Sequence, residues 1–263
     1  MTSPLFPINQ AKLALKEGRS VIGTMLAEIR QPAIMQVLLN AGFDLVIIDN
    51  EHGPFNIETI ADLSRTARWL GLTPIVRVPD LAYPYLAQSL DGGAQGIMLP
   101  RVYTVEQVEQ AVQIMKYPPL GLRGCAFSRG HSDFQPKPLT ETMAQANDET
   151  MLVVQVETKE AVDNIEAIVT VPGVDVALVG PTDLSIALGV PGQLGSPILH
   201  AAIEKVIAVC QQHNVYPGIH INGKEAATHW ATKGMRLVSS ESETGLLTQA
   251  GLGLTSAIRE ALG

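Results

Sequence analysis

The chain has 263 residues, of which 46% are hydrophobic and 17% are charged, with a formal net charge of −8 and a pI of about 5.2. So much apolar material excludes an intrinsically disordered chain, and the acidic balance argues against nucleic-acid binding, which relies on clustered Lys and Arg. The length fits two domains, or one barrel of alternating strands and helices.

The composition also indicates the compartment. Two cysteines, Cys125 and Cys210, lie far apart and form no CxxC pair, which disfavours a disulfide framework and a zinc–thiolate site. The N-terminal segment lacks the basic start and long apolar run of a signal peptide. No apolar run approaches the roughly 18 residues that a membrane span needs. We therefore expect a soluble, cytoplasmic protein without a membrane or nucleic-acid partner.

Eight short β-rich runs alternate with segments of helical spacing along the whole chain. The predicted strands are Val21–Ala27, Leu45–Asp49, Pro74–Val78, Gly96–Pro100, Leu152–Glu157, Val174–Gly180, Tyr216–Ile221 and Arg236–Ser240. The predicted helices are Pro32–Asn40, Ile57–Leu70, Tyr83–Asp91, Val105–Tyr117, Lys159–Val169, Pro197–His213, Lys224–Thr232 and Gly245–Leu262.

This alternation favours a (β/α)₈ TIM barrel of class α/β, with residues 1–263 forming a single domain. An open, doubly wound sheet is the alternative, but no GxGxxG follows the first strand to support a dinucleotide site. The last helix, Gly245–Leu262, is apolar and glycine-rich. It either covers the barrel or exchanges with a partner subunit.

Polar side chains stand where the predicted strands end. The run Leu45–Asn56 (LVIIDNEHGPFN) ends a buried strand at Asp49, followed by Glu51 and His52. Arg77 lies near the end of the next predicted strand, between Val76 and Val78. Catalytic groups of such barrels lie at the carboxyl ends of the strands and in the loops that follow, so we expect these groups to meet.

Glu157 ends one predicted strand, Asp183 follows the end of the next, and Gln155 shares a strand face with Glu157. Two convergent carboxylates with few other ligands suit an oxygen-preferring divalent ion such as Mg²⁺ or Mn²⁺. Alternatively, Asp183 or Glu157 caps the helix that follows it.

The remaining candidates have two interpretations each. Arg77, inside an apolar strand, either pairs with Asp49 or binds an anionic or carbonyl group of a ligand. An imidazole held by a carboxylate can act as general acid or base, which suits His52 beside Asp49. The amides of Gly180 and Thr182 either cradle an anion or belong to an ordinary turn.

In this order and spacing, the motifs IDNEHGPFN, PIVRVP, YPPLGLRG, VQVETKEAVDNIEAI and VGPTDLSIALG closely resemble the HpcH/HpaI family of class II pyruvate aldolases. The resemblance runs from Gly23 to about Ser240. It implies a metal-dependent aldolase similar to those acting on 4-hydroxy-2-oxoheptanedioate and 2-dehydro-3-deoxyglucarate.

By this resemblance, Glu157 and Asp183 are the protein ligands of a divalent metal ion (Mg²⁺, Mn²⁺ or Co²⁺). Arg77 polarises the pyruvate carbonyl and stabilises the enolate, and His52 and Asp49 form a proton-transfer dyad. Gln155 lies near the metal, and the amides of Gly180 and Thr182 hold the pyruvate carboxylate. The resemblance also implies hexamers, as trimers of dimers, with a terminal helix exchanged between partners.

Some residues depart from the family pattern. Asn50 replaces the usual glycine before Glu51-His52, and Gly53–Phe55 and Cys125–Phe134 also differ. These differences concern the aldehyde half of the substrate rather than the pyruvate half.

The sequence therefore predicts reversible cleavage of a 4-hydroxy-2-oxo acid to pyruvate, or hydroxypyruvate, and an aldehyde. A CoA-ester lyase of the citramalyl or malyl type and a non-catalytic barrel that binds 2-oxo acids are the alternatives. A Schiff-base route is disfavoured because no lysine lies inside a predicted strand.

Overall fold

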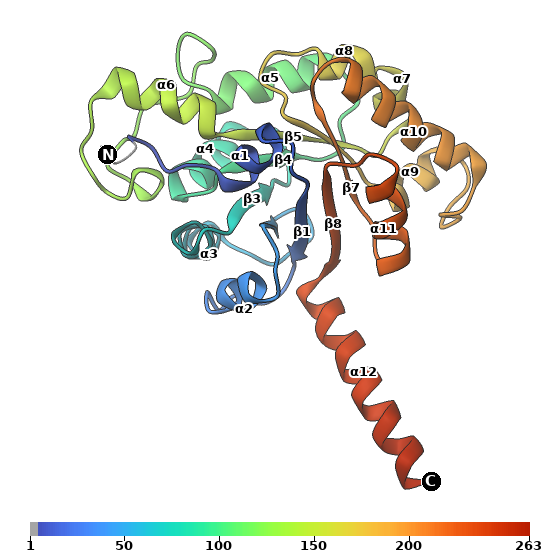
Figure 1. Cartoon of the computed structure of the whole chain (residues 1–263). Helices are drawn as coiled ribbons and strands as arrows, with labels where there is room; N and C mark the ends of the chain where they lie inside the picture. Colours follow the sequence, from blue (N-terminus) through green and yellow to red (C-terminus); the bar gives the residue numbers. More distant parts are fainter. Residues whose placement is uncertain (1–4) are drawn as a thin grey trace.

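The computed structural model describes residues 5–263. Eight parallel strands form a closed barrel in sequence order, with β8 pairing back onto β1 (Figure 1). The predicted (β/α)₈ barrel is therefore confirmed. The strands are β1 Val21–Leu26, β2 Leu45–Asp49, β3 Thr73–Arg77, β4 Gly96–Leu99, β5 Met151–Val156, β6 Val176–Val179, β7 Tyr216–His220 and β8 Leu237–Ser242.

Helices surround the barrel. They are α1 Gln10–Lys16, α2 Ile34–Asn40, α3 Ile57–Leu70, α4 Tyr83–Gly92, α5 Val105–Met115, α6 Leu139–Glu149, α7 Lys159–Asp163, α8 Ile165–Val169, α9 Pro181–Ala187, α10 Pro197–Gln212, α11 Lys224–Thr232 and α12 Glu243–Leu262, with a 3₁₀ turn at Gly130–Ser132. Among residues 5–263, no helix is both long and apolar enough to cross a membrane.

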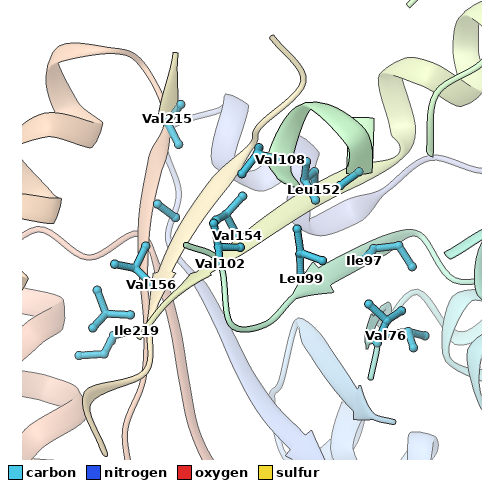
Figure 2. Close-up of a cluster of buried hydrophobic side chains, with 14 of the residues drawn as sticks. Val76, Ile97, Leu99, Val102, Val108, Leu152, Val154, Val156, Val215 and Ile219 are labelled. Atoms are coloured by element: carbon cyan, nitrogen blue, oxygen red, sulfur yellow. The ribbon is translucent and has the colours of Figure 1, made fainter. Parts of the chain in front are cut away.

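Each strand separates two hydrophobic layers. In β2, Leu45 and Ile47 belong to the cluster inside the barrel, whereas Val46 and Ile48 pack outward with the helices. All five residues of β2 are buried, as expected for a parallel strand covered on both faces. Figure 2 shows part of the outer layer, where side chains from several strands meet the helices.

Local signals explain most helix boundaries. The Asn56 side chain caps α3 by accepting from the Thr59 amide, and Thr104 forms a capping box with Gln107 at α5. Gly71 ends α3 in the left-handed conformation. The predicted helix Lys159–Val169 is two helices, which are separated at Asn164.

Helix α1 lies across the amino ends of the strands. Its Ala11 and Leu15 join the cluster inside the barrel, and the Lys12 ammonium pairs with Asp175 just before β6 at 2.7 Å. The Asn9 side chain, which caps α1, donates to the Gln95 carbonyl just before β4. The side chains of α1 therefore close this end of the barrel.

Helix α12 projects away from the barrel (Figure 1). Its first residue is fixed, because the buried Glu243 carboxylate accepts hydrogen bonds from the amides of Ala27, Glu28 and Ile29 at 2.7–2.9 Å. Farther along, the helix is exposed. Its apolar side chains at least half exposed to solvent are Leu247, Leu252, Leu254, Ile258 and Leu262.

Candidate active site

Asp49 and Arg77 end adjacent strands and lie directly opposite each other in the β2–β3 register. The guanidinium donates to both carboxylate oxygens, Nε to Oδ1 at 2.9 Å and Nη2 to Oδ2 at 2.7 Å. Burial acts to raise the pKa of Asp49, but the hydrogen bonds and charge of Arg77 outweigh it, so the pKa is lowered. The pairing that the sequence left open is therefore present, and Asp49 is held as a carboxylate.

Glu51 links this pair to the mouth of the barrel. One carboxylate oxygen lies 3.4 Å from Nη1 of Arg77, and the other lies 3.1 Å from Nε of Arg101. The side chain is only 8% exposed. Glu51 therefore supports two guanidinium groups, one buried and one at the surface.

Glu157 follows β5 directly and is buried. One of its carboxylate oxygens accepts the backbone N–H of Arg101 at 2.6 Å, and the other accepts from the Gln155 amide. Burial raises the pKa of Glu157 to about 7, with the Arg101 N–H opposing and the charges of Asp183 and Glu51 contributing to the rise. An uncompensated negative charge is therefore costly at this position.

Asp183 lies in the first turn of α9 and shares a cavity of about 370 Å³ with Glu157. Gly180, not Asp183, is the N-cap residue of α9, and no side chain caps this helix. Glu157 is not a cap either, because Thr158 caps α7. The capping alternative is therefore wrong for both carboxylates. The cavity is lined by Glu51, His52, Arg101, Tyr103, Glu157, Thr158, Glu160, Asp183, Ile186 and Ala187.

The His52 side chain lines the same cavity, but it forms no hydrogen bond with the Asp49 side chain with which it was expected to form a dyad. Asp49 accepts only the backbone N–H of His52, at 3.3 Å. The imidazole is 72% exposed, and its Nε2 lies 3.9 Å from Glu51. Because the oxygens of Asp49 are taken by Arg77 and by backbone amides, the neighbour of the imidazole is Glu51.

The backbone amides of Gly180 and Thr182, predicted to bind an anion, are not both free to do so. The Gly180 N–H donates to the Val156 carbonyl at 3.2 Å and is not free for a ligand. Gly180 instead permits close packing, because a Cβ there would lie 3.1 Å from Nε2 of Gln155 and 3.2 Å from Oε2 of Glu157. Thr182 is exposed in the first turn of α9.

Arg101 is the site residue whose position sequence reasoning could not specify. Its backbone has a φ of 51°, in the left-handed region that non-glycine residues seldom occupy. This conformation accompanies the hydrogen bond of its N–H to Glu157. The segment Cys125–Phe134, which differs from the family pattern, contributes no residue to the cavity. It packs against α3 and α4, where Arg68 donates to the Gly130 carbonyl.

Residues 24–250 match the HpcH/HpaI aldolase/citrate lyase family. A 4-hydroxy-2-oxo-heptane-1,7-dioate aldolase from Escherichia coli is 33% identical over 92% of this chain and 92% of its own length. A 4-hydroxy-4-methyl-2-oxoglutarate aldolase from Chaetomium globosum is 32% identical, over 88% and 87% respectively. The crystal structure of an HpcH/HpaI aldolase from Desulfitobacterium hafniense superposes with a TM-score of 0.91 at 33% identity, covering 95% of this chain and 96% of the other.

The closed barrel, its buried acidic strand ends and these relatives define an enzyme of the carbon–carbon lyase class. Most of the chain matches one family over a continuous range. The chain belongs to the HpcH/HpaI aldolase/citrate lyase family.

Proposed function

We propose that this enzyme reversibly cleaves 4-hydroxy-2-oxo acids to pyruvate, or hydroxypyruvate, and an aldehyde, with a divalent metal ion held by Glu157 and Asp183. The observation that carries the proposal is the carboxylate pair in the cavity at the carboxyl ends of the strands. Both curated relatives described above are aldolases of 4-hydroxy-2-oxo acids by name.

The donor set fits a hard divalent cation. Within residues 5–263, no cluster of three or more His, Cys, Asp or Glu side chains is arranged to hold a metal. Two carboxylates suit Mg²⁺, Mn²⁺ or Co²⁺, which retain waters and accept substrate oxygens. The buried Oε1 atom of Gln155, beside Glu157, has no hydrogen-bond partner in the described part of the chain. When bound, such an ion supplies a Lewis acid for the 2-oxo group.

The charge balance supports the same assignment. Asp49, Glu51, Glu157, Glu160 and Asp183 contribute five carboxylates, whereas Arg77 and Arg101 contribute two guanidinium groups. One divalent cation offsets two of the three remaining negative charges. It would also remove the repulsion that helps to raise the pKa of Glu157.

Arg77 stabilises the negative charge that develops when the C3–C4 bond breaks. The pKa of Arg77 is raised, because hydrogen bonding to Asp49 and the nearby carboxylates outweigh burial, so the group stays charged. A guanidinium has five N–H donors; Asp49 accepts two of them, and Nη1 lies 3.4 Å from Glu51. A fixed cation close to the reacting oxygen lowers the barrier because it need not reorganise during the reaction.

His52 transfers the proton of the 4-hydroxyl. It lines the cavity and is open to solvent, so it can exchange protons after each turnover. An imidazole can both accept and donate a proton, which suits this role. Glu51 is the carboxylate beside the ring, at 3.9 Å from Nε2, whereas Asp49 holds Arg77 in position.

The enzyme assembles as a homo-oligomer, a hexamer made of dimers that exchange α12. Two hollows flank the base of α12, of about 650 Å³ beside α11 and about 490 Å³ beside α2, and Leu246 lines both. A helix with an exposed apolar stripe beside apolar hollows suits reciprocal packing between identical chains.

The proposal is tested by pyruvate release from 4-hydroxy-2-oxo acids with Mg²⁺, Mn²⁺ or Co²⁺, with and without EDTA. We expect turnover that EDTA abolishes and added metal restores. Turnover that survives complete metal removal would refute the metal-dependent mechanism. Cleavage of a malyl-type CoA ester alone would indicate the CoA-ester lyase, and tight binding without cleavage would indicate a binding protein.

A further inference from the structure

Arg101 stands at the mouth of the cavity. It follows β4, and its backbone is fixed by the N–H···Oε1 hydrogen bond to Glu157. The residue is therefore joined directly to a carboxylate that the proposed function assigns to the metal. Under the proposed function, a substrate held by its 2-oxo acid end in this cavity would share it with the Arg101 side chain, which lines the same space.

The guanidinium is held from two sides and open on a third. Its Nε lies 3.1 Å from Glu51, and its Nη2 donates to the Pro79 carbonyl at 2.6 Å. Its Nη1 has no hydrogen-bond partner among residues 5–263. The side chain is 57% exposed, so Nη1 can bind an oxygen of a ligand without breaking either anchor.

The rest of the cavity lining is acidic or uncharged, apart from His52. Among the residues that line it, Arg101 is the only lysine or arginine. The carboxylates of Glu51, Glu160 and Asp183 would repel an anionic group placed beside them. A second negative charge on a substrate therefore has one favourable position, at the guanidinium of Arg101.

We propose that Arg101 is a specificity-determining residue that binds a carboxylate at the far end of the aldehyde half, so that the preferred aldehyde is an anionic carbon chain. This inference depends on the proposed aldolase function. Arginine suits the role because its planar group is always charged and can hold one carboxylate at Nε while presenting further N–H groups to another. The competing explanation is that Arg101 only neutralises Glu51.

The kinetic test compares two aldehydes of equal chain length in the condensation direction with pyruvate. Succinic semialdehyde carries a terminal carboxylate and butanal does not. We expect the wild type to prefer succinic semialdehyde in kcat/KM. Arg101→Gln should reduce this preference about tenfold, as loss of one partly exposed charged hydrogen bond predicts, and Arg101→Lys should retain part of it.

A charge-matched control is Arg19→Gln, because Arg19 pairs with Glu17 beyond α1, at the opposite end of the barrel. This variant should keep the wild-type preference. Binding supplies a readout without turnover, since 2-oxoheptanedioate and 2-oxoheptanoate lack the 4-hydroxyl. Calorimetry with Mn²⁺ present should show tighter binding of the dioate, and Arg101→Gln should reduce that difference.

The outcomes separate the two proposals. A wild type that condenses neither aldehyde and releases no pyruvate from 4-hydroxy-2-oxo acids refutes the proposed function, whereas one that releases pyruvate but does not condense succinic semialdehyde refutes the role of Arg101. A wild type that condenses both without preference, or an Arg101→Gln variant that keeps both the preference and the binding difference, refutes the role of Arg101. A preference that falls in Arg101→Gln and not in Arg19→Gln supports it.

Discussion

The buried carboxyl of Glu157 should make the metal-free protein less stable as the pH rises. Burial raises its pKa from 4.5 to about 7 in the folded chain. Between these values the folded chain binds more protons than the unfolded chain, so the free energy of unfolding decreases with rising pH. At about 1.4 kcal/mol per pKa unit, this contribution is about 3 kcal/mol. It is fully present below about pH 4.5 and lost as the pH passes 7.

The assay is urea unfolding in EDTA at pH 5 and pH 8, at one protein concentration, for the wild type and Glu157→Gln. Glutamine keeps the shape and can accept the Arg101 N–H, but it does not titrate. The wild type should lose about 3 kcal/mol more than the variant between the two pH values. Glu160→Gln, in the exposed next helix, serves as the control and should follow the wild type. Parallel losses in wild type and Glu157→Gln would refute the reasoning.

Three further predictions follow from the same contacts. Arg77→Ala leaves Asp49 buried without its cation, so it should lower the free energy of unfolding by about 3–5 kcal/mol and abolish turnover. Urea unfolding and pyruvate release measure the two effects. Arg77→Lys should restore stability more than activity. Gly180→Ala should weaken metal binding measured by calorimetry, because its Cβ would crowd Oε2 of Glu157 at 3.2 Å, and unchanged affinity would contradict this. Truncation after Thr244 removes most of α12 and should lower the mass measured by light scattering, whereas an unchanged oligomer would refute helix exchange.

Much of the barrel was predictable because its signals are local. All eight strands fall within a few residues of the apolar runs, and parallel strands bring Asp49 and Arg77 to the same end of the barrel. The sequence pattern does not predict helices α1 and α6, and it indicates α9 only as the helix that Asp183 would cap. Their short or weakly periodic segments resemble loops when the tertiary contacts that stabilise them are unknown.

Which residues form the site was easier to predict than which of them contact one another. The partner of Asp49 depends on the β2–β3 register, which places Arg77 opposite Asp49. The oxygens of Asp49 therefore accept hydrogen bonds from Arg77, and the His52 ring lies beside Glu51. The hydrogen bond from Arg101 to Glu157 depends on a left-handed backbone that no sequence pattern specifies. Such contacts join residues 28 and 56 positions apart in the chain and depend on how neighbouring strands pair.

The closure of the barrel by α1 bears on the order in which the proposed reactants bind and leave. Ala11, Leu15 and Lys12 fill the amino end, and the cavity beside His52 and Arg101 opens at the other end, so we expect a ligand among the strand ends to leave through this mouth. Under the proposed function, the aldehyde lies nearer that mouth than pyruvate and must depart first. Steady-state kinetics of cleavage should therefore show pyruvate as a competitive product inhibitor and the aldehyde as a noncompetitive one.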